Sequence, residues 1–107
     1  MPDDATAIIL LTTIGATADV EPLARALVEE RLAACVNVLP PMRSFFRWEG
    51  SVQADEERQL VIKTSSGRLE ELQRRLRTLH PYELPEMLVL SARGSDDYLA
   101  WIVESTS

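Results

Sequence analysis

The sequence contains one cysteine and one histidine among 107 residues, and this scarcity excludes several kinds of site. A single cysteine cannot form an internal disulfide, which favours a reducing compartment, so we expect a cytoplasmic protein. One cysteine with one histidine cannot complete a closed structural zinc site. A serine or cysteine triad would have to use His80, and nothing in the spacing supports one.

Basic residues are also in short supply. The chain has 11 Lys and Arg against 17 Asp and Glu, for a net charge of -6. This balance argues against nucleic-acid binding and against binding to an anionic membrane, because both need a basic surface. No apolar run approaches the roughly 20 residues that span a bilayer. The start, MPDDATAIILL, is acidic, unlike a secretory signal.

No linker, repeat or low-complexity stretch divides the chain, so residues 1–107 are expected to form a single domain. Apolar periodicity and turn residues predict the elements. They are a strand at 7–13, a helix at 18–33, a strand at 34–40, a hairpin of 42–48 with 51–64, a helix at 65–79, a strand at 86–92 and a helix at 94–106. This order predicts an α+β, ferredoxin-like βαββαβ fold with an antiparallel sheet, a long hairpin between its second and third strands, and a short C-terminal helix.

Several residues are expected to mark the element boundaries. Asp19 can cap the first long helix, and Ser65 or Ser66 can cap the second. Pro81 should end the second helix at His80, since the residue before a proline disfavours helical geometry. Glu49-Gly50 is the predicted turn of the hairpin.

The predicted strands are apolar on both faces. IILL, CVNVL, LVIK and MLVL do not alternate with polar residues, as a sheet with one wet face would. Two helices cover only one face, so another subunit is expected to cover the other.

The segment LHPYELPE, residues 79–86, raises the sharpest functional question. Its histidine, His80, is either a ligand or the last residue of a helix, favoured there by the helix dipole. Cys35 is either a metal ligand or a small buried strand residue. The stretch FFRWEG either lines a ligand pocket or anchors the hairpin on a neighbour, and its aromatic and Arg content favours an interface. Lys63, in an apolar strand, should pair with a carboxylate or an anionic ligand, or extend its ammonium group to the solvent at the rim.

Five segments occur in this order along the chain: ERLAACVNVLP, WEG, EERQLVIKT, HPYELPE and DYLAWI. In this order they resemble the signature segments of the CutA divalent-cation-tolerance family, and the match runs from about residue 12 to residue 102. The resemblance implies a homotrimer of PII-like architecture without enzymatic activity. It further implies binding of a divalent cation, copper especially, or of a small anionic effector at clefts between subunits, in metal homeostasis or signalling. No cofactor is expected to be required for folding.

The resemblance also implies site residues. The ligand-cleft candidates are Trp48, Glu49, Glu57, Lys63, Tyr82 and Glu86, and the metal candidates are His80 and Cys35. Arg47 stands where an aromatic is usual, Ser51 where a lysine is common, and Cys35 is the only cysteine, which weakens a thiolate copper site. Two other functions are weighed against metal or effector binding. One is a structural trimeric scaffold that binds another protein, and the other is an enzyme that uses His80 with Glu57 or Lys63.

Overall fold

The computed structural model describes residues 6–107. The acidic start of the chain, on which the argument against a signal peptide partly rests, lies outside the described residues. The elements, in order, are β1 (Ala7–Gly15), α1 (Glu21–Glu29), β2 (Cys35–Val38), β3 (Met42–Trp48), β4 (Ser51–Ser65), α2 (Leu69–Leu79), β5 (Leu88–Ser91) and α3 (Asp96–Ser105), with a 3-10 turn at Ser66–Arg68 before α2.

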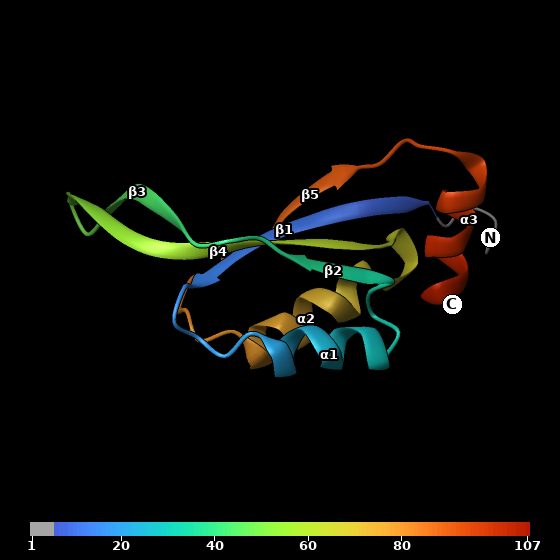
Figure 1. Cartoon of the computed structure of the whole chain (residues 1–107), viewed down its shortest axis with the longest axis horizontal. Coiled ribbons are helices and arrows are strands. Elements are labelled where there is room, and N and C mark those ends of the chain that lie inside the picture. The colour runs from blue at the N-terminus through green and yellow to red at the C-terminus, as the bar shows by residue number, and fades with distance from the viewer. Residues whose placement is uncertain (1–5) are drawn as a thin grey trace.

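The sheet is antiparallel with the order β2-β4-β1-β5, and β3 pairs with the outer half of β4. The central strand β4 therefore contacts β1 and β2 at one end and β3 at the other (Figure 1). This arrangement confirms the predicted ferredoxin-like α+β fold, including the long hairpin and the C-terminal helix.

The β3–β4 hairpin projects from the body of the molecule (Figure 1). Pro40 and Pro41 separate β2 from β3 because neither can donate a backbone hydrogen bond to the ladder. The two-residue turn at the tip is Glu49-Gly50, as predicted, with φ of 49° and 83°. Positive φ at both central residues is the geometry of a type I′ turn, whose twist matches that of the paired strands.

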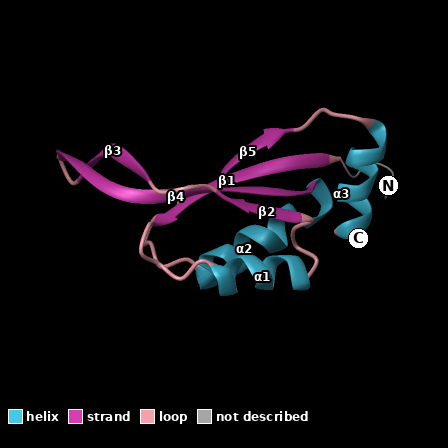
Figure 2. Ribbon diagram, in the orientation of Figure 1, coloured by secondary structure: helices cyan, strands magenta, loops and turns pink. Residues whose placement is uncertain are grey.

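Helices α1 and α2 both lie on one face of the sheet (Figure 2). Between them and the sheet, Leu10, Leu60 and Ile62 have no exposed surface, and they pack with Leu27, Leu72 and Leu76. Each fully buried aliphatic side chain of this kind stabilises the fold by about 1.5–3 kcal/mol. The apolar stripes predicted for the two helices thus form the core.

The observed helix ends agree only partly with those predicted from the sequence. His80 is the C-terminal cap of α2, where Pro81 ends the helix as predicted. The predicted side-chain caps are wrong: Val20 occupies the N-cap of α1, and no side chain caps α1 or α2. The Ser66 hydroxyl instead accepts a hydrogen bond of 3.0 Å from the Thr6 N–H, because the 3-10 turn moves Ser66 away from the start of α2.

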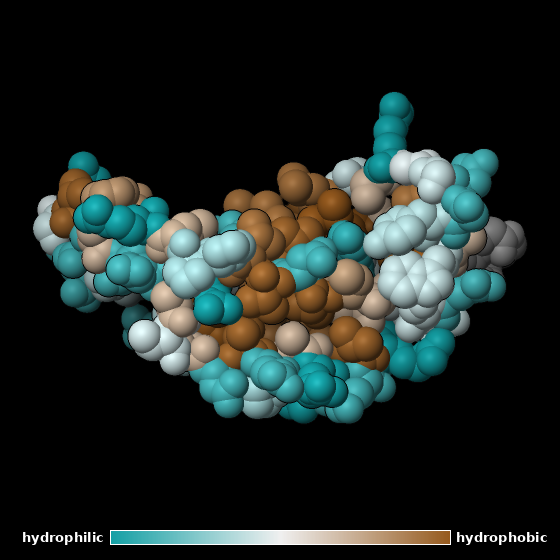
Figure 3. Space-filling model, viewed as in Figure 1, coloured by the Kyte–Doolittle hydropathy of each residue, from teal (hydrophilic) through white to brown (hydrophobic). Residues whose placement is uncertain are grey.

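The other face of the sheet is open along most of its length. Ile9, Leu11 and Val61 point to this side together with Leu88 and Leu90, which are 57% and 49% exposed. Helix α3 covers one end, where Ile102 packs on Ala7 and Ala34. We call this sheet face, opposite α1 and α2, the open face. Figure 3 shows hydrophobic residues over the sheet and hydrophilic ones along α1 and α2.

Within residues 6–107, no helix has the length and apolar character to cross a membrane.

Candidate functional site

A cleft of about 950 Å³ lies between the β3–β4 hairpin and the segment 81–86. Its hairpin wall consists mainly of alternate residues of two paired strands. Across β3 and β4, Met42 pairs with Glu57, Ser44 with Asp55, and Phe46 with Gln53. Because side chains alternate along a strand, these residues share one side of the hairpin, and that side continues the open face of the sheet. The cleft is thus built where the open face passes onto the hairpin.

His80 fixes the loop that forms the opposite wall. Its ring is buried at 7% exposure, and Nε2 donates a hydrogen bond of 2.7 Å to the Thr13 carbonyl. Nδ1 accepts a hydrogen bond of 3.1 Å from the Tyr82 N–H. The imidazole therefore ties the loop after α2 to β1 and sets the position of Tyr82. In this conformation neither ring nitrogen is free to bind a metal.

Tyr82 and Glu57 form the deepest polar contact of the cleft. The Tyr82 hydroxyl donates a hydrogen bond of 2.7 Å to Glu57 Oε2, and Glu57 is 7% exposed. Burial, followed by the contact with the Glu57 carboxylate, raises the pKa of the Tyr82 hydroxyl. Tyr82 consequently stays protonated as the donor to Glu57 throughout the physiological pH range.

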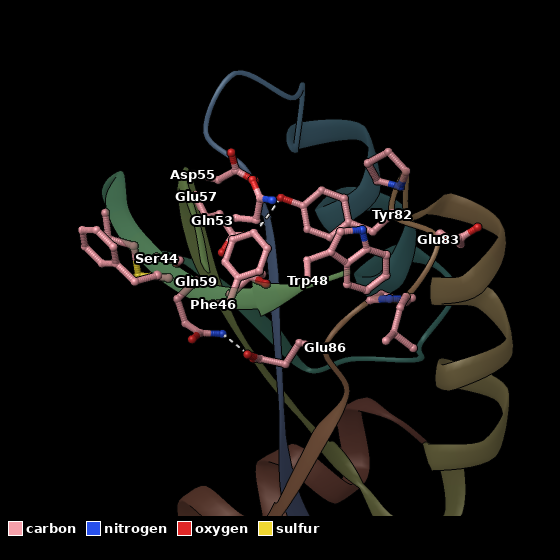
Figure 4. A pocket seen from close by; sticks show the side chains of 16 residues that line it. Ser44, Phe46, Trp48, Gln53, Asp55, Glu57, Gln59, Tyr82, Glu83 and Glu86 are labelled. Atoms are coloured by element: carbon pink, nitrogen blue, oxygen red, sulfur yellow. Dashed lines mark hydrogen bonds between the residues drawn. The ribbon is translucent and has the colours of Figure 1, made fainter. Parts of the chain in front are cut away.

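A second polar contact closes the other side of the cleft. Gln59 Nε2 donates to Glu86 Oε2 at 3.1 Å and to the Thr12 carbonyl of β1 at 2.7 Å. Figure 4 shows Phe46 and Trp48 of β3 in the same cleft as the Glu57–Tyr82 and Gln59–Glu86 hydrogen bonds. Phe46 pairs with Gln53 and Trp48 with Ser51, so these two aromatic residues come from the part of the hairpin nearer its tip.

The cleft is acidic. Four carboxylates line it, and none of its lining residues is Lys, Arg or His; the carboxylates are Asp55, Glu57, Glu83 and Glu86. Negative charge of one sign on the walls of a cleft concentrates cations there. The site is thus electrostatically matched to a cationic ligand rather than an anionic one.

The structure brings together four of the six predicted cleft residues: Trp48, Glu57, Tyr82 and Glu86 all line it. Glu49 lies at the hairpin turn, outside the lining. Lys63 lies six residues from Glu57 along β4, about 20 Å away at strand spacing. Its Nζ is 3.3 Å from the Tyr98 hydroxyl, so within the chain its partner is an aromatic residue, not the predicted carboxylate.

The two predicted metal ligands do not meet in one chain. Cys35 is paired with Lys63, whereas His80 binds Thr13, which is paired with Gln59 four residues away along β4. In the part of the chain that the structure describes, no three His, Cys, Asp or Glu residues form a group able to hold a metal ion. A metal site that uses these residues stays a prediction.

Sequence reasoning missed several residues of the cleft, among them Asp55 and Gln59. It offered the stretch FFRWEG as a possible pocket lining but favoured an interface, and Phe46 and Trp48 of this stretch do line the cleft. Alternation could have found the missed residues, because once Glu57 is placed in a strand, Asp55 and Gln59 fall on the same side of it. What the sequence could not supply was the pairing register, which sets Ser44 beside Asp55 and Phe46 beside Gln53.

Comparisons with known proteins agree with this geometry. The chain is 42% identical over 99 residues to the divalent-cation tolerance protein CutA of Thermus thermophilus, a match that covers 92% of this chain and 96% of the relative. The solved structure of the Thermus thermophilus protein (Cut A1) superposes with a TM-score of 0.89 at 41% identity, covering 94% of this chain and 99% of that one.

A structure described as the periplasmic divalent cation tolerance protein CutA from Archaeoglobus fulgidus gives a TM-score of 0.88 at 32% identity, with 94% and 99% of the two chains covered. The family model described as CutA1 divalent ion tolerance protein matches residues 8–105. The chain therefore belongs to the CutA1 divalent ion tolerance family.

Proposed function

We propose that the protein is a non-enzymatic homotrimer that binds a divalent cation, copper foremost, at the acidic cleft and serves in metal homeostasis. The observation that carries this proposal is the charge of the cleft, with four carboxylates and no basic residue in its lining. The names of the relatives, which refer to divalent-cation tolerance, agree with it. Carboxylate oxygens are ligands for divalent ions, so Glu57 and Glu86 would supply part of a site whose remaining ligands come from outside the single chain.

A single chain offers an incomplete metal site, and this ties the metal proposal to assembly. The cleft opens on the same side as the open face, where Leu88 and Leu90 are exposed. An exposed apolar sheet face is a surface for association. In the proposed trimer, neighbouring chains cover the open face, and their side chains or water complete the coordination of the metal.

Native mass spectrometry of the full chain with one equivalent of Cu(II) tests both parts. We expect a trimer that takes up three copper ions, with uptake reduced in a Glu57→Gln, Glu86→Gln double variant. Glu29→Gln is the matched control, because Glu29 is an exposed carboxylate on α1, away from the cleft. Uptake that is equal in all three proteins would refute the cleft as the metal site, and a monomer would refute the assembly.

A second candidate function is a structural scaffold for another protein. The hairpin favours it, since Phe45 and Val52 lie in paired strands there with 66% and 69% of their surfaces exposed. A partner recovered equally by wild type and by a Phe45→Ser, Val52→Ser variant would exclude the hairpin as the docking surface.

The cytoplasm is the compartment we propose, because a chain with a single cysteine and no internal disulfide suits a reducing compartment. The Archaeoglobus fulgidus relative is described as periplasmic, so the family occurs in more than one compartment. Cell fractionation with an antibody to the native chain tests this point.

A further inference from the structure

We propose that the β3–β4 hairpin binds an extended acidic segment of another protein, in which an apolar side chain stands between two carboxylates. This inference rests on the second candidate function in one respect, that the hairpin is a docking surface for protein, and it names the chemistry of the partner. The surface concerned is the side of the hairpin that faces away from the acidic cleft.

The hairpin has two faces of different character, because side chains alternate along each of its strands. Met42, Ser44 and Phe46 are half-buried on the cleft side, whereas the residues between them are exposed. Residues that pair across the two strands share a face. The second face, which we call the outer hairpin face, consists of six exposed residues: Arg43, Phe45 and Arg47 of β3 and Val52, Ala54 and Glu56 of β4.

The outer hairpin face lies on the helix side of the sheet, beyond α1 and α2. Along β4, Ala54 and Glu56 alternate in step with Leu60 and Ile62, which pack against the helices. Figure 1 shows that the hairpin projects past both helices, which therefore leave this face uncovered. The neighbouring chains that we place on the sheet cover its open face, on the opposite side, so the proposed trimer does not require this surface.

Charge is divided between the two faces of the hairpin. The outer hairpin face has Arg43 and Arg47, and Arg58 follows on the same side of β4. Its one acid is Glu56. The cleft side of the hairpin has the two acids of β4 that line the cleft and no Lys or Arg. In a chain of net charge -6, the outer hairpin face is locally basic, and it is complementary to a partner with negative charge.

The two arginines of this face have no carboxylate partner in the part of the chain that the structure describes. Glu56 pairs with Arg43 across the strands but forms no ion pair with it. The Arg43 guanidinium instead lies 5.3 Å from the centre of the Phe45 ring, in a cation–π contact. Both cations are therefore available to the carboxylates of a partner.

Phe45 and Val52 form the apolar centre of the face, with 66% and 69% of their surfaces exposed. Phe45 also borders the cleft, but its alternation with Ser44 and Phe46 turns its ring to the outer side. Ala54, which pairs with Phe45, is too small to cover this ring. An exposed aromatic residue between arginines has the composition of a protein interface.

The spacing of these residues favours an extended partner. Arg43, Phe45 and Arg47 follow one another at steps of two residues, which is about 7 Å each in a strand. An extended segment has the same repeat, so an acidic, an apolar and a second acidic side chain at alternate positions face the three residues together. Carboxylates four residues apart on a helix are only about 6 Å apart along its axis, against roughly 13 Å between the two arginines.

Titration of the isotopically labelled full chain with a synthetic peptide, followed by amide chemical shifts, tests the proposal. The probe is acetyl-Gly-Glu-Thr-Phe-Thr-Glu-Gly-amide, and the control peptide has the same residues with the two glutamates adjacent. We expect saturable shifts at residues 42–48 and 51–56, and binding at least about tenfold weaker for the control peptide, because only one of its carboxylates meets an arginine. Added salt should weaken binding of the probe.

Substitutions then locate the contact. An Arg43→Glu, Arg47→Glu variant should weaken binding of the probe by at least about tenfold, and Phe45→Ser should weaken it as well. The matched control is an Arg74→Glu, Arg77→Glu variant, because both arginines are exposed on α2. A peptide with lysine in place of each glutamate should bind the hairpin charge variant more tightly than it binds wild type. Circular dichroism verifies folding, and the two peptides test the proposal on the wild-type chain should a variant fail to fold.

The outcomes separate this inference from the proposed functions. Copper uptake depends on the cleft, so its failure would leave this inference standing. A partner protein lost from the Phe45→Ser, Val52→Ser variant, without binding of the probe, would overturn the inference and leave the scaffold proposal standing. Equal binding of the two peptides, or binding unchanged in the hairpin charge variant, would also overturn it. So would binding of single-stranded oligodeoxythymidine in place of the probe, which would make the partner a nucleic acid.

Discussion

The two faces of the sheet have similar composition but opposite environments. On the helix side, Leu10 and Ile62 have no exposed surface. On the open side, Leu88 and Leu90 are about half exposed, although they are as apolar as the core residues. A chain that places leucine on both faces of a strand is built for a second covering layer. The difference shows that the single chain covers one face of its sheet with helices and leaves most of the other face exposed.

The largest expected effect comes from a charge on the open face. Leu90→Lys places an ammonium where we propose that a neighbouring chain packs, and it should convert the trimer to monomers because a buried unpaired charge is costly. Sedimentation velocity measures this. Val28→Lys is the control, since Val28 is 43% exposed on α1, and it should leave the assembly intact. A trimer that persists in Leu90→Lys would contradict the proposal that a neighbouring chain covers the open face.

Adjacent leucines sharpen the comparison further. Leu10→Ala, on the helix side, should lower the free energy of unfolding by about 2–5 kcal/mol at any protein concentration, because it opens a cavity in the core. Leu11→Ala, on the open side, should have an effect that depends on protein concentration, because we propose that a second chain covers this face. Urea denaturation at two protein concentrations separates the two cases. Identical, concentration-independent losses would mean that the open face stays uncovered in solution.

The polar end of the open face should respond less strongly. Tyr82→Phe removes the hydroxyl that donates to buried Glu57, and the unpaired carboxylate should cost about 1–3 kcal/mol of stability. Tyr98→Phe is the matched control, because Tyr98 is 43% exposed and its hydroxyl contacts the flexible Lys63 side chain at 3.3 Å. Thermal unfolding measures both. Equal shifts in the two variants would show that burial of Glu57 does not set the effect.

The outer surface of the helix layer should respond least. Arg75 on α2 donates to both Glu30 carboxylate oxygens, at 2.9 and 2.8 Å, and these hydrogen bonds lower the pKa of Glu30. Because the folded-state pKa is lowered, the unfolded chain binds the proton more readily. The stabilisation is therefore present above the ordinary pKa of 4.5 and is lost as the pH falls through the folded-state value.

Glu30→Gln should accordingly cause a small loss of thermal stability at neutral pH and none at a pH well below 4.5. The loss should be small because the pair is on the surface, where solvent screens it. Melting curves at the two pH values measure the difference, and Glu29→Gln serves as a control on the same helix. A deficit that is the same at both pH values would indicate a cause other than this ion pair.

Much of the fold could be predicted because its signals are local. Pro81 ends α2, Glu49-Gly50 forms the turn, and the leucines of α2 face the core, each through the geometry of a few neighbouring residues. The predicted cap of α2 was wrong for a non-local reason. A 3-10 turn precedes α2, and the Ser66 hydroxyl binds Thr6, 60 residues away in the chain, instead of capping the helix.

The candidate site, like the fold, could be predicted only in part. The sequence indicated that HPYELPE carries function, and Tyr82 and Glu86 do line the cleft. It did not reveal that both ring nitrogens of His80 are hydrogen-bonded, one to the Thr13 carbonyl and one to the Tyr82 N–H. In this conformation His80 holds the loop after α2 in place. The sequence also grouped Lys63 with Glu57, although the two residues lie six positions, about 20 Å, apart along β4.

The sequence by itself determined the order of the elements, the apolar character of both sheet faces and the acidic balance of the chain, because periodicity, turn residues and charge are local properties. The tertiary structure alone decided which side of β4 meets the helices and which carboxylates share the cleft with Phe46 and Trp48. The physical reason is strand register. A shift of one residue would turn every side chain of a strand to the other face, and register is set by packing between segments far apart in the chain.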